Sequence, residues 1–217
     1  MIDRRDSALA SPGLRRLAQA RTIEAPPPAL ERCELCGEPI PSAHRHLLHL
    51  HSRELLCACR ACSLLFDRRA AGDGHYRLVP QRRLRLEGLE LSEPDWEQLR
   101  IPVAIAFFTR DSAAGRMLAM YPSPIGATES HLELPMWEAL ERAHPVLETI
   151  AEDVEALLVN RARGARRQWI VPIDDCYRLV AVIRTSWRGF TGGSEARLAL
   201  ERFFDDLDQT SSPEQRR

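Results

Sequence analysis

Several apolar stretches in the second half of the chain have the length and composition of β-strands. The longest clean apolar run is 101–108, and the stretch 101–109, with a proline near its start, predicts a buried strand. Apolar residues also predict strands at 117–121 and 179–187. Residues 154–160 and 168–173 predict a hairpin, because a short arginine-rich turn separates these two apolar runs.

Helical patterns occur in three places between and after these strands. Ser92 can cap a short helix that follows it, and residues 135–143 predict a second helix with a proline in its first turn. A final helix is predicted around Gly193, with Phe203 and Leu207 on one apolar stripe. Strands therefore outnumber helices, and the short connections favour a mostly antiparallel sheet in an α+β fold.

The first half of the chain is marked by cysteines, five of which fall between positions 33 and 62. Cys33 and Cys36 form one CxxC motif, followed by Gly37, and Cys59 and Cys62 form a second. A CxxC turn directs two sulfurs at one point, and a following glycine eases the curl of the backbone. Two such turns can complete a tetrahedral metal site.

The segment between the two motifs predicts a β-hairpin, with strands at 44–50 and 54–58 and a bend at 51–53. Motif, hairpin and motif together have the layout of a zinc ribbon. We therefore expect a zinc-ribbon-like module at residues 31–66. Metal binding would stabilise it, because so small a segment buries little apolar surface.

The whole chain is thus predicted to be an α+β protein in which this small module precedes an α+β domain at residues 67–208. Residues 1–30 contain three consecutive prolines and predict a flexible leader. The polar residues 209–217 predict a flexible tail.

The expected metal ligands are Cys33, Cys36, Cys59 and Cys62. Four thiolates suit a structural Zn²⁺ ion and equally suit a single rubredoxin-type iron. Rubredoxin-like sites tend to have glycine and proline around both motifs, whereas here only the first motif is followed by glycine. Zinc is therefore favoured, with iron as the alternative.

Further metal-binding residue types lie beside these ligands. Cys57 would share a strand face with Cys59 and could replace it, but a small buried side chain beside the site is the favoured interpretation. The hairpin also contains four histidines: His44, His46, His49 and His51. They could bind a second metal ion. However, no carboxylate lies within the run to complete a set of ligands, so we expect that these histidines do not bind a metal.

Composition and charge narrow the class of protein. The 217 residues are 44% hydrophobic and 28% charged, as in globular proteins, and the net charge of −1 argues against a globally basic nucleic-acid binder. All 30 basic residues are arginine, which indicates a GC-rich bacterial genome. The absence of lysine excludes Schiff-base catalysis and phosphate binding by a P-loop lysine. With neither an apolar run of membrane-spanning length nor an export signal, we expect a cytoplasmic protein with reduced cysteines and no membrane insertion.

One segment is locally positive. Seven arginines lie between positions 60 and 86: Arg60, Arg68, Arg69, Arg77, Arg82, Arg83 and Arg85. They could bind an acidic partner or phosphate, or acidic residues elsewhere in the chain could neutralise them. The neutral total charge favours the second interpretation.

The sequence offers little support for catalysis. A dense cluster of functional groups in the C-terminal part consists of Asp174, Asp175, Cys176 and Tyr177. Cys176 has no histidine nearby in sequence, although His131 or His144 could approach it in space. We expect Asp174 to cap a helical turn and Cys176 to lie in the core, which favours a non-catalytic protein.

These segments together resemble an uncharacterised bacterial family that is catalogued as a domain of unknown function. The most specific part is the five-cysteine pattern at residues 33–41 and 56–66, with the histidines at 44–48. Further segments that resemble the family are residues 121–126, 153–161, 171–180 and 187–193. The resemblance covers roughly residues 31 to 205.

Genes of the family that this chain resembles occur in actinobacteria and other high-GC bacteria, beside those of nickel–iron uptake hydrogenases. The resemblance implies a role in assembly, maturation or electron supply of a hydrogenase and implies no catalytic residue. We therefore expect a non-catalytic metal-binding accessory protein that contacts a hydrogenase subunit or a maturation factor. Two alternatives stay open: a rubredoxin-like electron-transfer protein for the hydrogenase, and a zinc-ribbon protein that binds nucleic acid.

Overall fold

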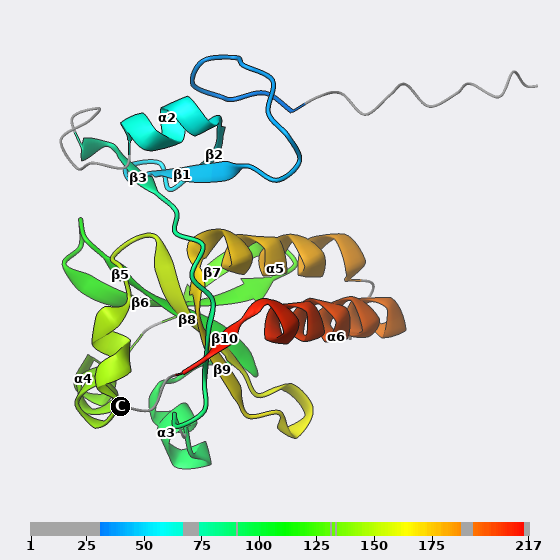
Figure 1. Cartoon of the computed structure of the whole chain (residues 1–217). Helices are drawn as coiled ribbons and strands as arrows, with labels where there is room; N and C mark the ends of the chain where they lie inside the picture. The colour runs from blue at the N-terminus through cyan, green and yellow to red at the C-terminus, as the bar shows by residue number, and fades with distance from the viewer. Residues whose placement is uncertain are drawn as a thin grey trace, which may run out of the picture.

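The described residues form two sheets of very different size, as the computed structural model in Figure 1 shows. The structure describes residues 31–66, 74–89, 91–130, 132, 134–187 and 193–214. The predicted leader at residues 1–30 lies outside the described residues, as do His131 and the last three residues. None of the described helices has the length and hydropathy needed to cross a membrane.

The small sheet has three strands in the order β2-β1-β3. β1 (Arg45–His49) and β2 (Leu55–Ala58) form the predicted antiparallel hairpin, and β2 leads into the short helix α2 (Arg60–Leu65). β3 (Tyr76–Leu78) pairs with the free side of β1. The third strand comes from beyond residue 66, so the small sheet also depends on the chain that follows the predicted module.

The large sheet has the order β10-β4-β9-β8-β5-β6-β7. Its strands are β4 (Leu84–Leu86), β5 (Ile105–Asp111), β6 (Arg116–Ser123), β7 (Gly126–Ser130), β8 (Glu155–Asn160), β9 (Arg167–Pro172) and β10 (Ser212–Pro213). Each pair is antiparallel except β10 with β4. The predicted α+β fold with a mostly antiparallel sheet is therefore confirmed.

Helices cover both faces of this large sheet, and we call the sheet with its helices the body. Its helices are α3 (Glu93–Gln98), α4 (Leu134–Ala143), α5 (Ile173–Ser186) and α6 (Gly193–Thr210), with 3₁₀ turns η2 (Pro145–Thr149) and η3 (Ala162–Gly164). Alternate residues of the central strands point to opposite faces. Phe108 and Leu157 pack with α3 and α4, whereas Phe107 and Leu158 pack with α5 and α6. Figure 1 shows α5 and α6 side by side on their face.

The predicted strand at residues 179–187 is wrong, because this segment belongs to α5 up to Ser186. The buried residues Ile173, Cys176, Val180 and Ile183 recur at intervals of three or four, which places them on one helix face. Burial of this face against the sheet outweighs the preference of valine, isoleucine and threonine for strands.

Other element boundaries differ from prediction by a few residues. β5 begins at Ile105 and not at residue 101, because Pro102 has no N–H to donate to a neighbouring strand. α6 begins at Gly193 as predicted and continues to Thr210. β10 then pairs with β4, so the first residues of the predicted tail are part of the described secondary structure.

The small sheet packs onto the body through a shared apolar core. Leu48 of β1 is fully buried in the same cluster as Phe107 and Trp169 of the large sheet. Val79, directly after β3, is buried in this cluster, and Leu55 of β2 packs against it. The two sheets are therefore not independently packed units.

A buried carboxylate reinforces this contact. The side chain of Asp153, which is 1% exposed, lies 2.9 Å from Arg53 Nη1 in the hairpin turn and 2.8 Å from Arg77 Nη1 in β3. It also accepts the backbone N–H of Ser112 in the body at 3.0 Å. One anion thus joins two arginines of the small sheet to the large one.

Asp153→Asn should lower the free energy of unfolding by about 3 kcal/mol, because it removes the buried counter-charge that Arg53 and Arg77 share and leaves them only longer ion pairs at 3.9 Å and 3.6 Å. Urea denaturation measures the change. Arg116→Ala, which removes an exposed pair with Glu129, is the control and should have little effect. If both variants lost equally little stability, Asp153 would not hold the small sheet on the body.

Candidate metal centre

The structure brings together the four cysteines that the sequence predicts as metal ligands. The Sγ atoms of Cys33, Cys36, Cys59 and Cys62 all lie within 4.8 Å of one another, and those of Cys36 and Cys59 are 3.7 Å apart. We call these four residues the four-cysteine cluster. Cys33 is buried and Cys36 is exposed, so the cluster lies at the surface.

The first motif is a tight turn that hydrogen bonds hold closed. The N–H of Cys33 donates to the carbonyl of Glu38, and the N–H of Gly37 donates to the carbonyl of Cys33, both at 2.8 Å. Gly37 has a φ of +77°, a conformation that disfavours residues with a Cβ. The glycine therefore allows both sulfurs of the motif to point to one side.

The second motif needs no glycine because it is the start of a helix. Cys59 is the N-cap of α2, and its Sγ accepts the N–H of Cys62 at 3.4 Å. The helical turn places Cys62 over Cys59. Glu34 joins the first motif to β2, the strand that leads into the second motif, since its N–H donates to the carbonyl of Cys57 and its carboxylate accepts the N–H of Cys57.

The thiols of the four-cysteine cluster differ in acidity. Burial disfavours the thiolate of Cys33, but backbone N–H groups of Cys59, Leu35 and Cys36 donate to its sulfur and lower its pKa to about 6. Burial and the neighbouring sulfurs raise the pKa of Cys62 to about 12. One thiolate thus makes a second one unfavourable, because like charges at this distance repel each other. A bound cation would remove this repulsion and displace protons.

The donor set fits a tetrahedral metal ion. Zn–S bonds of about 2.3 Å imply sulfurs about 3.8 Å apart in a tetrahedron, close to the separation of Cys36 and Cys59. No side-chain rearrangement between these two sulfurs is needed for a shared ion. The four-cysteine cluster can therefore hold a metal ion.

Cys57 and the histidines lie apart from the four-cysteine cluster. A ring nitrogen of His44, a ring nitrogen of His46 and the Sγ of Cys57 form a second group within 4.8 Å of one another. His49 instead contacts Ser52 in the hairpin turn. Sequence reasoning recognised these residue types but did not bring Cys57 to the histidines; the alternation of a strand pair was the available signal.

Part of the arginine-rich segment is neutralised within the chain, as the total charge suggested, whereas residues 68 and 69 lie outside the described residues. Arg82 forms two hydrogen bonds with the buried carboxylate of Glu155, and Arg83 forms two with buried Asp175. Arg85 pairs with Glu87 at 2.8 Å. These arginines are part of the fold and do not form an open anion-binding surface.

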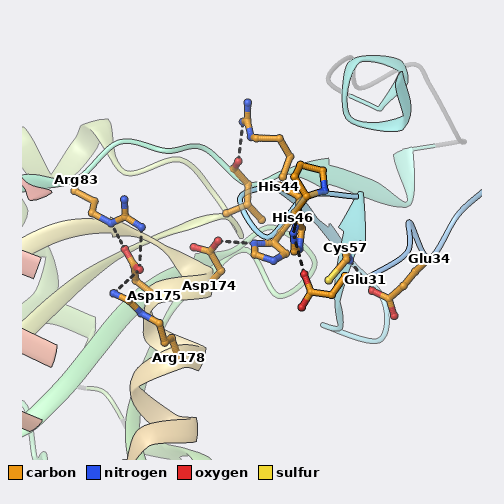
Figure 2. Close-up of polar contacts among 12 residues, drawn as sticks. Glu31, Glu34, His44, His46, Cys57, Arg83, Asp174, Asp175 and Arg178 are labelled. Carbon is orange, nitrogen blue, oxygen red and sulfur yellow. Dashed lines mark hydrogen bonds and ion pairs between the residues drawn. The ribbon is translucent and has the colours of Figure 1, made fainter. Parts of the chain in front are cut away.

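The functional groups of the predicted C-terminal cluster lie in α5, where they point to different surroundings. Cys176 is fully buried in the core, as expected, and burial raises the pKa of its thiol well above the ordinary value. The expectation that Asp174 caps the helix is wrong, because the N-cap is Pro172. Asp174 Oδ2 instead lies 2.8 Å from Nδ1 of His46, as Figure 2 shows.

Comparison with known proteins supports the extent of the predicted domain family. A family model described as DUF5947, a family of unknown function, matches residues 32–211. This range includes both cysteine motifs and nearly all of both sheets. Neither curated proteins nor solved structures give a match.

Replacing Cys36 or Cys59 with serine should remove the metal from the four-cysteine cluster and unfold the two cysteine motifs, because metal binding supplies their folding free energy. Elemental analysis and limited proteolysis measure both effects. Ser63→Ala, a change in α2 beside Cys62, is the control and should retain the metal. Full metal content in both cysteine variants would contradict the four-thiolate site.

Proposed function

We propose that this chain, which belongs to the DUF5947 family of unknown function, is a non-catalytic zinc-binding accessory protein that presents a metal-stabilised surface to a protein partner. The observation that carries the proposal is the convergence of four cysteine sulfurs within 4.8 Å. A closed set of four thiolates leaves no coordination position for a substrate, which is the property of structural zinc sites.

Zinc is the ion that we assign to the four-cysteine cluster. The second motif continues directly into α2 and lacks the glycine that follows the first, unlike the paired turns of rubredoxin-like iron sites. We place the protein in the cytoplasm, where its thiols stay reduced and available to the metal. The alternative is a rubredoxin-like iron site for electron transfer, which the exposed Cys36 would suit.

The surface that we assign to the partner is the exposed side of α2. Leu64 and Leu65 are 64% and 61% exposed, although the helix that holds them is otherwise fixed by Cys59 and Cys62. Adjacent exposed leucines on a rigid element are typical of a protein contact. Because Arg82, Arg83 and Arg85 are paired within the chain, this apolar surface is a better candidate than the arginine-rich segment.

The partner that we propose is a hydrogenase subunit or a hydrogenase maturation factor. The resemblance of residues 31–205 to proteins encoded beside nickel–iron hydrogenase genes supports this partner. A protein-binding role is also compatible with the neutral net charge, which disfavours binding to nucleic acid.

The protein purified without added metal should contain about one tightly bound zinc per chain and should lack visible absorption. Elemental analysis and a visible spectrum measure both. Iron together with a red colour would replace the accessory role with the electron-transfer alternative.

Deletion of the gene should impair hydrogenase activity or assembly in a strain that makes a nickel–iron hydrogenase. Complementation with the Leu64→Asp/Leu65→Asp double variant should fail, because charges at the apolar contact prevent binding of the partner. Ile125→Asp, a change at an 89% exposed residue between β6 and β7, is the matched control and should complement. Normal hydrogenase activity and assembly in the deletion strain would exclude the proposed partner.

A further inference from the structure

One face of the small sheet gathers the side chains of His44, His46 and Cys57, which we call the His–Cys cluster. His46 in β1 is directly opposite Cys57 in β2, and His44 precedes His46 by two residues. Residues two apart share a strand face, as do residues directly opposite across a strand pair. The three donor atoms accordingly lie within 4.8 Å of one another. The cluster shares no residue with the four-cysteine cluster.

Hydrogen-bond acceptors orient both imidazoles. Nδ1 of His46 lies 2.8 Å from Oδ2 of Asp174, at the start of α5 in the body (Figure 2). Nδ1 of His44 lies 3.0 Å from the carbonyl oxygen of Pro41 and 3.3 Å from a carboxylate oxygen of Glu31. An acceptor at one ring nitrogen leaves Nε2 as the donor to a metal. Histidines that bind metals almost always have such a carboxylate or carbonyl partner at the other nitrogen.

Two buried polar atoms at the cluster lack a hydrogen-bond partner among the described residues. One is Nε2 of His44, whose side chain is only 8% exposed. The other is Oδ1 of Asp174. A buried polar atom without a partner destabilises the fold, so such atoms in native proteins generally contact water or an ion. At His44 the unpartnered atom is the nitrogen that a metal would bind.

The surroundings favour a cation. Figure 2 shows the carboxylates of Glu31 and Glu34 close to His44 and Cys57, and Asp174 on the other side of His46. The side chain of His46 is 31% exposed, and Cys57 is partly exposed, so solvent reaches the cluster. An ion can therefore enter without unfolding of the small sheet.

We propose that His44, His46 and Cys57 form a second metal site, for a divalent transition ion of the Zn²⁺ or Co²⁺ type. Two imidazoles and one thiolate select such ions over Mg²⁺ and Ca²⁺, which prefer oxygen ligands. Three protein ligands leave one tetrahedral position for an external ligand, in contrast to the four thiolates of the four-cysteine cluster. The second ion is thus exchangeable, whereas the first is structural.

The position of Asp174 gives this site a further property. Two of the ligands lie in β1 and β2 and the third directly precedes β1, but the carboxylate that orients His46 belongs to α5 of the body. Asp174 is a positioning residue, because it acts on the metal through His46. Metal affinity at this site therefore depends on correct packing of the small sheet against the body.

The test uses the full chain. Metal-free protein first receives one equivalent of Zn²⁺, which fills the four-cysteine cluster, and is then titrated with Co²⁺ while its absorption is recorded. Wild type should bind one equivalent of Co²⁺ with thiolate-to-cobalt charge transfer, and elemental analysis should show that the zinc is retained. His44→Ala and Cys57→Ser should show no such signal at concentrations that saturate wild type.

Asp174→Asn should weaken binding of Co²⁺ by about 10- to 100-fold while it retains the charge-transfer signal at saturation. His49→Ala is the matched control, because this histidine lies in the same strand but contacts Ser52, and it should bind Co²⁺ like wild type. Circular dichroism and binding of the first zinc confirm that each variant is folded.

Two results would overturn the second site. One is the absence of a cobalt signal in wild type after the first zinc is bound. The other is an equal signal in wild type, His44→Ala and Cys57→Ser, which would place the cobalt elsewhere. Failure of the first zinc to bind would instead contradict the four-cysteine cluster, so the two sites are judged separately.

Discussion

The small sheet cannot form a hydrophobic core of its own, and the rest of the structure depends on how this constraint is met. Three short strands and a six-residue helix bury too little apolar surface to fold alone. Two external supports compensate. Leu48 and Val79 enter a core of the body, and the buried carboxylate of Asp153 binds Arg53 and Arg77. On the other side, the two cysteine motifs converge on one point where a metal ion can connect them.

This arrangement assigns different chemistry to the two regions around one hairpin. The ends of the hairpin lead into the two CxxC motifs, whose four sulfurs form a closed donor set. The face that turns toward α5 holds His44, His46 and Cys57, an open donor set with an unpartnered nitrogen. Glu34 connects the two, because it binds both N–H and carbonyl of Cys57 from within the first motif. Ions at the two sites would consequently stabilise the same few residues.

Local patterns predicted much of the fold because their physical causes are local. Ser92 caps α3 through the N–H of Asp95, and the carboxylate of Asp95 accepts the N–H of Ser92 in return. The two apolar runs and the arginine-rich turn between them predicted the central hairpin of β8 and β9 to within one residue. α5 was misjudged, because its valines and isoleucines favour strands in isolation and only the adjacent sheet makes their helical stripe advantageous.

The sequence by itself determined the four cysteines that can share a metal ion, since the spacing within each CxxC motif and the hairpin between the motifs constrain where the sulfurs lie. Only the tertiary structure decided the partners of the remaining charged and metal-binding residues. His46 meets Asp174 across 128 positions, and Arg83 meets Asp175 across 92. Each contact depends on how two segments far apart in the sequence pack together. Because packing is set by the whole core, no pattern within either segment specifies it.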